Sequence, residues 1–164
     1  MATLVLVQHG QALPKDVDPD RPLDDAGRAA VGRVAAFLAQ AGLRADRVLH
    51  SGKTRAAQTA EILAESLAGG VPPEARDGLG PKDDPAPVAE EAAGWSSDVV
   101  IAGHMPFVQR LASLLCAADA DAGVVDFQPG TAVGLRHDPE GGWAVAWMVG
   151  PAVLTGGTSA RAGS

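Results

Sequence analysis

The sequence has 164 residues, with 13 Lys and Arg against 20 Asp and Glu, so its formal net charge at pH 7 is −7. This length fits one domain with a substantial core, and a hydrophobic content of 46% excludes a generally disordered chain. An acidic chain without a cluster of Lys or Arg lacks the electrostatic footprint of nucleic-acid binding or of attachment to an anionic membrane, so we expect neither partner.

The predicted strands are short, almost unbroken apolar runs, which are typical of strands buried on both faces of a sheet. In chain order they cover Thr3 to Val7, Arg47 to His50, Asp98 to Ala102, Ala132 to Arg136 and Trp143 to Val149. Apolar residues recur with helical spacing between them, in Asp24 to Gln40, Lys53 to Leu67, Pro87 to Gly94 and Pro106 to Cys116. We expect Asp24 or Asp25 to cap the first helix, and Gly42 to end it.

Alternating strands and helices predict a single-domain α/β fold, a three-layer α/β/α sandwich with right-handed crossovers and a mainly parallel sheet. The last two strands, joined around Pro139 to Gly142, predict an antiparallel pair at one edge of the sheet. Gln11 to Pro22 and Gly69 to Pro87 are rich in prolines, glycines and charges, and long loops of this kind are usually functional or disordered. We expect the domain to cover residues 1–154 and residues 155–164 to form a flexible tail.

Histidines follow three of the predicted strands, where an open α/β sheet places its ligand crevice. His9 comes directly after the first strand, His50 ends the second, and His104 follows the third. A histidine at a strand end is also common as a partly exposed loop residue, but three at one edge favour a site. We expect His9 and His104 to act as a nucleophile and its electrostatic partner around an anion.

Two arginines fit the same anion site. Arg55 lies in the first turn of a predicted helix, where a guanidinium adds to free backbone N–H groups. Arg21 can reach the crevice from the long loop, or it can pair with Asp18, Asp20 or Asp24.

The sequence contains no motif that indicates a metal or cofactor site. The sequence has no paired-cysteine or His-x-x-His spacing, no Gly-x-Gly-x-x-Gly and no Walker motif, and its aromatic content of 4% argues against an aromatic-lined cofactor cleft. We therefore expect no metal and no cofactor. Cys116 is predicted to pack in the core, and His137 to face solvent. One cysteine and the absence of a signal-like segment lead us to expect a cytoplasmic protein.

Four motifs occur in an order that resembles a known family. They are Gln8-His9-Gly10 after an apolar strand, Arg21-Pro22-Leu23 with Gly27, His50-Ser51 followed by Arg55-Ala56-Ala57-Gln58-Thr59, and Ala102-Gly103-His104. Together they are similar to the signature of the histidine phosphatase superfamily, over about residues 3 to 150. The short length and the lack of a helical insertion make the chain most similar to SixA-type phosphohistidine phosphatases.

The resemblance implies that His9 is phosphorylated and then hydrolysed, while Arg55 and His104 hold the phosphoryl oxygens. Arg21 matches a position that contributes to the same pocket. Phosphoryl transfer needs in-line positioning and neutralisation of charge, which these side chains can supply.

The sequence departs from the family pattern at two places. Gln8 stands where the family has arginine, so a neutral amide replaces one phosphate-binding cation. Many family members also use a carboxylate after the second helix as the proton donor. Here Glu74 and Asp77 are the candidates, and either can equally be a surface residue of a polar loop.

Three functions remain open from the sequence. The first is a metal-independent phosphatase acting on phosphohistidine of a protein through a covalent intermediate at His9. The second is a phosphatase for a small phosphorylated metabolite, and the third is a catalytically weak relative that binds phosphoryl groups or a partner protein, suggested by Gln8.

Overall fold

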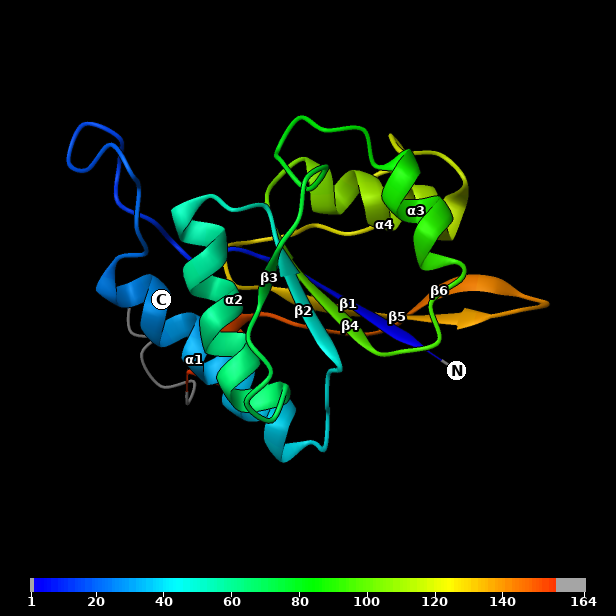
Figure 1. Cartoon of the computed structure of the whole chain (residues 1–164), viewed down its shortest axis with the longest axis horizontal. Coiled ribbons are helices and arrows are strands. Elements are labelled where there is room, and N and C mark those ends of the chain that lie inside the picture. The colour runs from blue at the N-terminus through cyan, green and yellow to red at the C-terminus, as the bar shows by residue number, and fades with distance from the viewer. Residues whose placement is uncertain (1, 156–164) are drawn as a thin grey trace, which may run out of the picture.

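The computed structural model describes residues 2–155, which form a mixed α/β fold around one six-stranded sheet (Figure 1). The strand order is β3-β2-β4-β1-β5-β6. The strands are β1 (Thr3–Gln8), β2 (Arg47–His50), β3 (Glu74–Ala75), β4 (Val99–Gly103), β5 (Ala132–Asp138) and β6 (Gly142–Val149). The helices are α1 (Asp25–Gln40), α2 (Thr54–Leu67), α3 (Ala86–Ala92), α4 (Phe107–Ala117) and the short 3-10 helix η1 (Pro151–Leu154).

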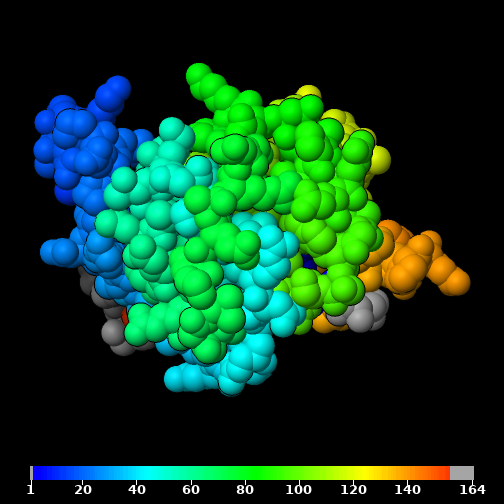
Figure 2. Space-filling view, in the orientation of Figure 1, coloured from blue at the N-terminus to red at the C-terminus, as the bar shows by residue number. Residues whose placement is uncertain are grey.

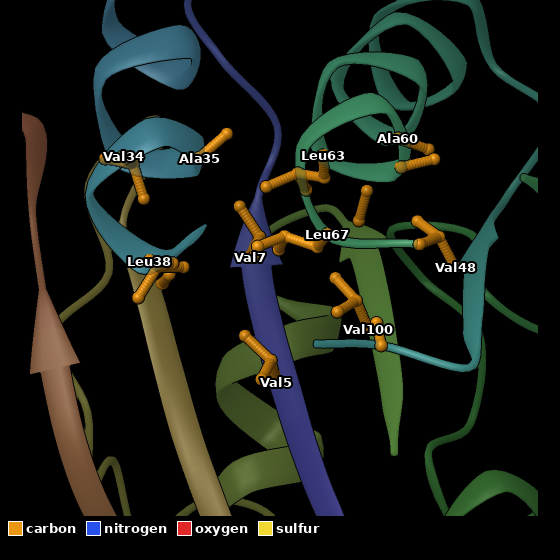
Figure 3. Packing of buried hydrophobic residues seen from close by; sticks show 14 of the residues in the cluster. Val5, Val7, Val34, Ala35, Leu38, Val48, Ala60, Leu63, Leu67 and Val100 are labelled. Carbon is orange, nitrogen blue, oxygen red and sulfur yellow. The ribbon is translucent and has the colours of Figure 1, made fainter. Parts of the chain in front are cut away.

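The sheet is the middle layer of the predicted sandwich, with α1 and α2 on one face and α3 and α4 on the other (Figure 1). Side chains alternate along β1, so Leu4 and Leu6 pack toward α3 and α4 while Val5 and Val7 pack toward α1 and α2. Both faces are covered, and the apolar run of the strand is therefore unbroken. Figure 3 shows the second set meeting the helices, with Val5, Val7, Val48 and Val100 directed at Val34, Ala35, Leu38, Ala60, Leu63 and Leu67.

Parallel pairing brings the carboxyl ends of three strands to one edge of the sheet. β4 lies between β1 and β2 and is parallel to both, with Gln8 opposite Gly103 and His50 opposite Ala102. The residues that follow these strands are therefore neighbours in space although they are far apart in sequence. The predicted parallel core of the sheet is confirmed.

The predicted antiparallel pair is also confirmed. β5 runs antiparallel to both β1 and β6, and β6 forms the outer edge. A register shift at Gly134/Leu135 leaves an extra residue in β6, which forms a β-bulge. The alternation of apolar and polar residues in the sequence did not predict this bulge. The β5–β6 hairpin projects at one side of the molecule, opposite the projecting segment 11–22 (Figure 2).

The helix ends follow local chemistry. Asp24, one of the two predicted caps, accepts a hydrogen bond from the N–H of Gly27 at 2.6 Å, so α1 begins at Asp25. α4 begins at Phe107 with Pro106 as its N-cap, one residue later than predicted, after a cis Met105–Pro106 bond. No helix among residues 2–155 is both long and apolar enough to cross a membrane.

The two long segments predicted to be irregular, 11–22 and 69–87, contain no helix before Ala86, but the second includes a short strand. Within the predicted loop 69–87, Glu74 and Ala75 pair with the end of β2 as the two-residue strand β3. The segment 11–22 contains no helix and touches other backbone through an isolated bridge between Ala12 and Leu23. Of the predicted tail, only Thr155 falls within the described residues, and positions 156–164 lie outside them.

Candidate active site

The structure brings His9 and His104 together at the carboxyl edge of the sheet. Their ring centroids are 5.1 Å apart, with the planes at 61°. The backbone N–H of His9 donates to the carbonyl of Gly103 at 2.9 Å, which ties the turn after β1 to the end of β4. The juxtaposition of these two predicted residues follows from the parallel register of the two strands.

The hydrogen bonds of His9 define its protonation. Nδ1 lies 2.7 Å from the carbonyl oxygen of Gly10, and because a carbonyl can only accept, Nδ1 carries the proton. Nε2 accepts from Nε of Arg55 at 3.3 Å. Burial lowers the pKa of His9, and the charges of Arg55 and Arg21 lower it further against the hydrogen bond to Gly10, which raises it. The Nε2 lone pair is thus free of a proton, as a nucleophile requires.

His104 is 1% exposed and shares its Nε2 with the hydroxyl of Ser51 at 2.6 Å. Burial, together with the nearby charges of His9, Arg55, Lys53 and Arg21, lowers the pKa of His104 to about 3. Its Nδ1 is buried without a hydrogen-bond partner among the described residues. The imidazole is therefore neutral in the free protein, and an entering anion would stabilise its protonated form.

Hydrogen bonds of the Thr59 side chain connect α2 to the turn that carries His9. The Thr59 hydroxyl accepts from the N–H of Gly10 at 3.1 Å and donates to the carbonyl of Arg55 at 2.8 Å. One buried side chain thereby fixes the nucleophile turn and the guanidinium relative to each other. Thr59 lies one helical turn after Arg55, and the Arg55–Thr59 motif of the sequence analysis included it without giving it a role.

His50, the third histidine at a strand end, supports the turn after β2. Nδ1 of His50 accepts from the N–H of Gly52 at 3.0 Å, and Gly52 has a positive φ of 90° that favours glycine. His50 thus holds the turn from which Ser51 reaches His104. The sequence prediction of His50 at the crevice edge holds, but its ring supports the turn and is not paired with His9.

Arg21 lies in the left-handed region, with φ of 49°, and its Nε donates to the carbonyl of Leu13 at 3.2 Å. Among residues 2–155, it forms no ion pair with an aspartate. Burial is the largest cause that lowers the pKa values of His9, Arg55 and His104, and the charge of Arg21 lowers all three further. Of the two alternatives for Arg21, this placement favours the crevice.

Gln8 ends β1, with its backbone N–H bonded to the carbonyl of Thr131 and its carbonyl bonded to the N–H of Gly130. Its side-chain Oε1 is buried without a donor among the described residues. A buried amide oxygen without a partner is uncommon in folded proteins. The position thus retains hydrogen-bonding capacity but has no positive charge.

The two predicted proton donors lie outside this cluster. Glu74 forms an ion pair with Arg47, Oε2 to Nε at 3.1 Å, on the exposed surface of β3 and β2. Asp77 is exposed in the following loop. The contacts of the described residues join neither of them to the two histidines.

A hollow of about 440 Å³ adjoins the arginine instead. Its lining residues are Lys53, Arg55, Gly80, Pro81, Lys82 and Asp83. Asp83, which the sequence analysis did not single out, accepts from the N–H of Gly80 at 2.7 Å. It sits in an acidic loop of ordinary composition, so no sequence signal distinguished it from Asp77.

Two further sequence predictions concern residues outside the site. Cys116 is half-buried and packs against the core on the α3 and α4 side, as expected. His137 is half-buried, because its ring stacks on Trp143 at a centroid distance of 4.7 Å. The expectation that His137 faces solvent is therefore only partly met.

Comparison with known proteins agrees with these motifs. Residues 4–80 match the family model of the histidine phosphatase superfamily (branch 1). No curated protein matches the chain.

Solved structures match nearly the whole chain. The protein histidine phosphatase SixA complexed with tungstate is 25% identical, with a TM-score of 0.79 over 93% of this chain and 99% of that chain. A candidate phosphohistidine phosphatase SixA from Agrobacterium tumefaciens is 21% identical, with a TM-score of 0.73 over 90% and 97%. A phosphoserine phosphatase from Entamoeba histolytica, in complex with phosphoserine, is 12% identical, with a TM-score of 0.67 over 90% and 96%.

The family match covers His9, in the turn after β1, and Arg55, in the first turn of α2, and the SixA structure matches 93% of the chain. The chain is therefore similar to the histidine phosphatase superfamily over residues 4–80, and its fold matches that of SixA phosphohistidine phosphatases.

Proposed function

We propose that this chain is a phosphatase that hydrolyses phosphohistidine on a protein through a covalent intermediate at His9. The match to the histidine phosphatase family model and the SixA-like structure support a phosphatase. The observation that carries the proposal is the unprotonated Nε2 of His9, which faces the guanidinium of Arg55 and lies beside a neutral, buried His104. The likeness to SixA supports phosphohistidine as the substrate.

In the first step, Nε2 of His9 attacks the phosphorus atom in line with the substrate's P–N bond. A new P–N bond forms to His9 while the old bond breaks, and its electron pair stays on the substrate nitrogen. If the other ring nitrogen of the substrate is already protonated, the leaving group departs as neutral imidazole and needs no further proton. Phosphohistidine therefore demands less general-acid help than a phosphate monoester.

In the second step, water attacks the phosphorus atom of phospho-His9. The P–N bond breaks and its electron pair returns to Nε2. The water oxygen and both of its protons leave with the phosphoryl group as dihydrogen phosphate, and His9 returns to its neutral form with the proton on Nδ1. The carbonyl of Gly10, bonded to Nδ1–H, stabilises the charge that the ring acquires while it is phosphorylated.

The surrounding side chains hold the transferred group. Arg55 offers a planar fork of donors at the start of α2, and His104 can donate once the dianion raises its pKa. We assign Arg21 to the same oxygens as a second cation and Gln8 as a neutral donor. These roles follow the family pattern at matching positions.

A proton donor is needed for a monoester substrate. Glu74 is already paired with Arg47, whereas Asp83 lines the hollow beside Arg55. We therefore place Asp83 beside Asp77 as a candidate for this role, ahead of Glu74.

A small phosphorylated metabolite is the second candidate substrate. The likeness to a phosphoserine phosphatase, and a hollow of about 440 Å³ next to Arg55, favour this reading. A catalytically weak phosphoryl-binding protein is the third reading, and its basis is the neutral Gln8.

The test compares turnover of a phosphohistidine peptide, p-nitrophenyl phosphate and a panel of metabolites. Enzyme quenched during turnover should carry phosphate that is acid-labile and base-stable on His9, located by mass spectrometry. His9→Ala should lose turnover and labelling, whereas His137→Ala, at the β5–β6 hairpin, should keep both. Full activity in His9→Ala contradicts the mechanism, and turnover confined to a metabolite supports the second reading.

A further inference from the structure

The hollow beside Arg55 is flanked by two lysines. The whole sequence contains three lysines, and two of them, Lys53 and Lys82, line this one surface. Lys53 is the N-cap residue of α2, and Lys82 lies in the loop that follows β3. Segments nearly 30 residues apart in sequence therefore bring their ammonium groups to the same hollow.

These ammonium groups are free to bind. Among residues 2–155, each ion pair joins an arginine to a carboxylate, and neither Lys53 nor Lys82 takes part in one. The neighbouring carboxylates are engaged locally, since Asp83 accepts from the N–H of Gly80 and Asp84 from the N–H of Ala86.

The charge balance of the lining favours an anion. Lys53, Lys82 and Arg55 give three positive charges against the single carboxylate of Asp83. The chain as a whole has a net charge of −7, but distant charges are screened within about 8 Å at physiological salt. The local cations therefore decide which group binds here.

The hollow continues the phosphoryl site. Arg55 is part of both, because it lines the hollow and also bonds Nε2 of His9. A group held by the two lysines would be attached to the same substrate molecule whose phosphoryl group lies between His9 and His104.

We propose that Lys53 and Lys82 form a specificity subsite for an acidic side chain, so that the preferred substrate is a phosphohistidine flanked in sequence by Asp or Glu. The inference rests on the proposed phosphohistidine phosphatase activity and narrows it to acidic sites on the partner protein. Both lysines are exposed, so each contributes modestly, about two- to fivefold in kcat/KM.

The experiment uses two phosphohistidine peptides that differ only in their flanking residues, Glu in one and Gln in the other. Wild type should prefer the Glu peptide in kcat/KM, and added salt should reduce this preference. Lys82→Gln should lower kcat/KM for the Glu peptide about two- to fivefold and leave the Gln peptide and p-nitrophenyl phosphate unchanged. Lys82→Glu should reverse the preference.

Lys15→Gln is the matched control, because Lys15 is exposed in the segment 11–22 and does not line the hollow. Equal kcat/KM for the two peptides in wild type overturns the subsite and leaves the proposed function intact, because both peptides are still hydrolysed. A Lys15→Gln effect equal to that of Lys82→Gln also overturns it, since general charge then explains the preference. Turnover of p-nitrophenyl phosphate without turnover of either peptide instead overturns the phosphohistidine proposal, and the subsite with it.

Discussion

Nε of Arg55 donates to Nε2 of His9 across 3.3 Å, so the free site holds a cation directly against the lone pair that would attack phosphorus. This contact keeps the lone pair unprotonated and marks where the phosphoryl oxygens would enter between the two side chains. The guanidinium must turn its donors from the imidazole to the oxygens when substrate binds.

Arg55→Lys should therefore lower kcat/KM although it keeps the charge. A lysine ammonium is a point charge without the planar fork, and the loss of one charge-assisted hydrogen bond corresponds to about a 10- to 100-fold decrease. Steady-state kinetics on one phosphohistidine peptide measures it, with Arg33→Lys, an exposed residue of α1, as the control. Wild-type kinetics in Arg55→Lys would show that charge alone is sufficient.

Acid should destabilise the fold through the buried histidines. The pKa of His104 is lowered to about 3 by burial, whereas an unfolded histidine titrates near 6.5, so the unfolded chain binds the additional proton between these values. The free energy of unfolding should thus fall as pH drops below 6.5, by at most about 1.4 kcal/mol per pH unit for each such group. The free energy of unfolding is measured with urea at several pH values between 7.5 and 5. It should fall less steeply with decreasing pH in His104→Gln than in the wild type, and an equal pH dependence contradicts the assignment.

Much of this site could be predicted from the sequence, because strand ends in a parallel sheet share an edge. His9 and His104 were placed together by that rule alone, and the register of β1 with β4 confirms their proximity. The rule locates residues at an edge but does not choose their contacts. The rule predicted that His50 lies at the crevice as His9 and His104 do. The ring of His50 instead accepts a hydrogen bond from the N–H of Gly52 and supports that turn.

The remaining features depend on packing between distant segments. Thr59 meets Gly10 only because α2 is seated on the sheet, and no local pattern encodes a contact across 49 positions. β3 has two residues, too few to show alternation, and its pairing with β2 gives Glu74 its partner Arg47. The same folding brings Asp83 and the two lysines beside Arg55.

Gly27→Ala should disturb the site from within α1. A Cβ at Gly27 would lie 2.1 Å from the carbonyl oxygen of Gln11, a backbone atom just after the nucleophile turn. We expect a loss of about 1 to 3 kcal/mol in the free energy of unfolding, together with reduced kcat, because residues 9–11 must shift. Gly32→Ala is the control, since nothing lies within 4 Å of its Cβ position in the same helix, and alanine there should be neutral or stabilising by up to about 1 kcal/mol. Equal stability of the two variants, measured by urea unfolding, would contradict this account.

Activity should survive treatment with EDTA. Within residues 2–155, no group of three or more His, Cys, Asp or Glu side chains is arranged to hold a metal ion, and the proposed steps use only protein groups and water. The measurement is turnover after chelation and again after addition of Mg²⁺, Mn²⁺ or Zn²⁺. Loss that one of these ions restores would place the enzyme in a different reaction class.

Gln8→Arg should raise activity if the amide at this position is a weakened form of the family arginine. A charge-assisted hydrogen bond exceeds a neutral one by about 1 to 2 kcal/mol, which corresponds to about a 5- to 30-fold increase in kcat/KM. The gain depends on Arg21, whose charge already acts on His9 and His104.

Arg21→Ala should therefore damage the wild type severely, and Gln8→Arg should partly rescue it. Measuring kcat/KM for the wild type, both single variants and the double variant on one phosphohistidine peptide gives the coupling between the two positions. If Gln8→Arg lowers activity while the protein stays folded, the amide is a specific feature of this pocket. Its buried Oε1, which has no donor among the described residues, would then be the atom to pair with a hydrogen-bond donor of the substrate.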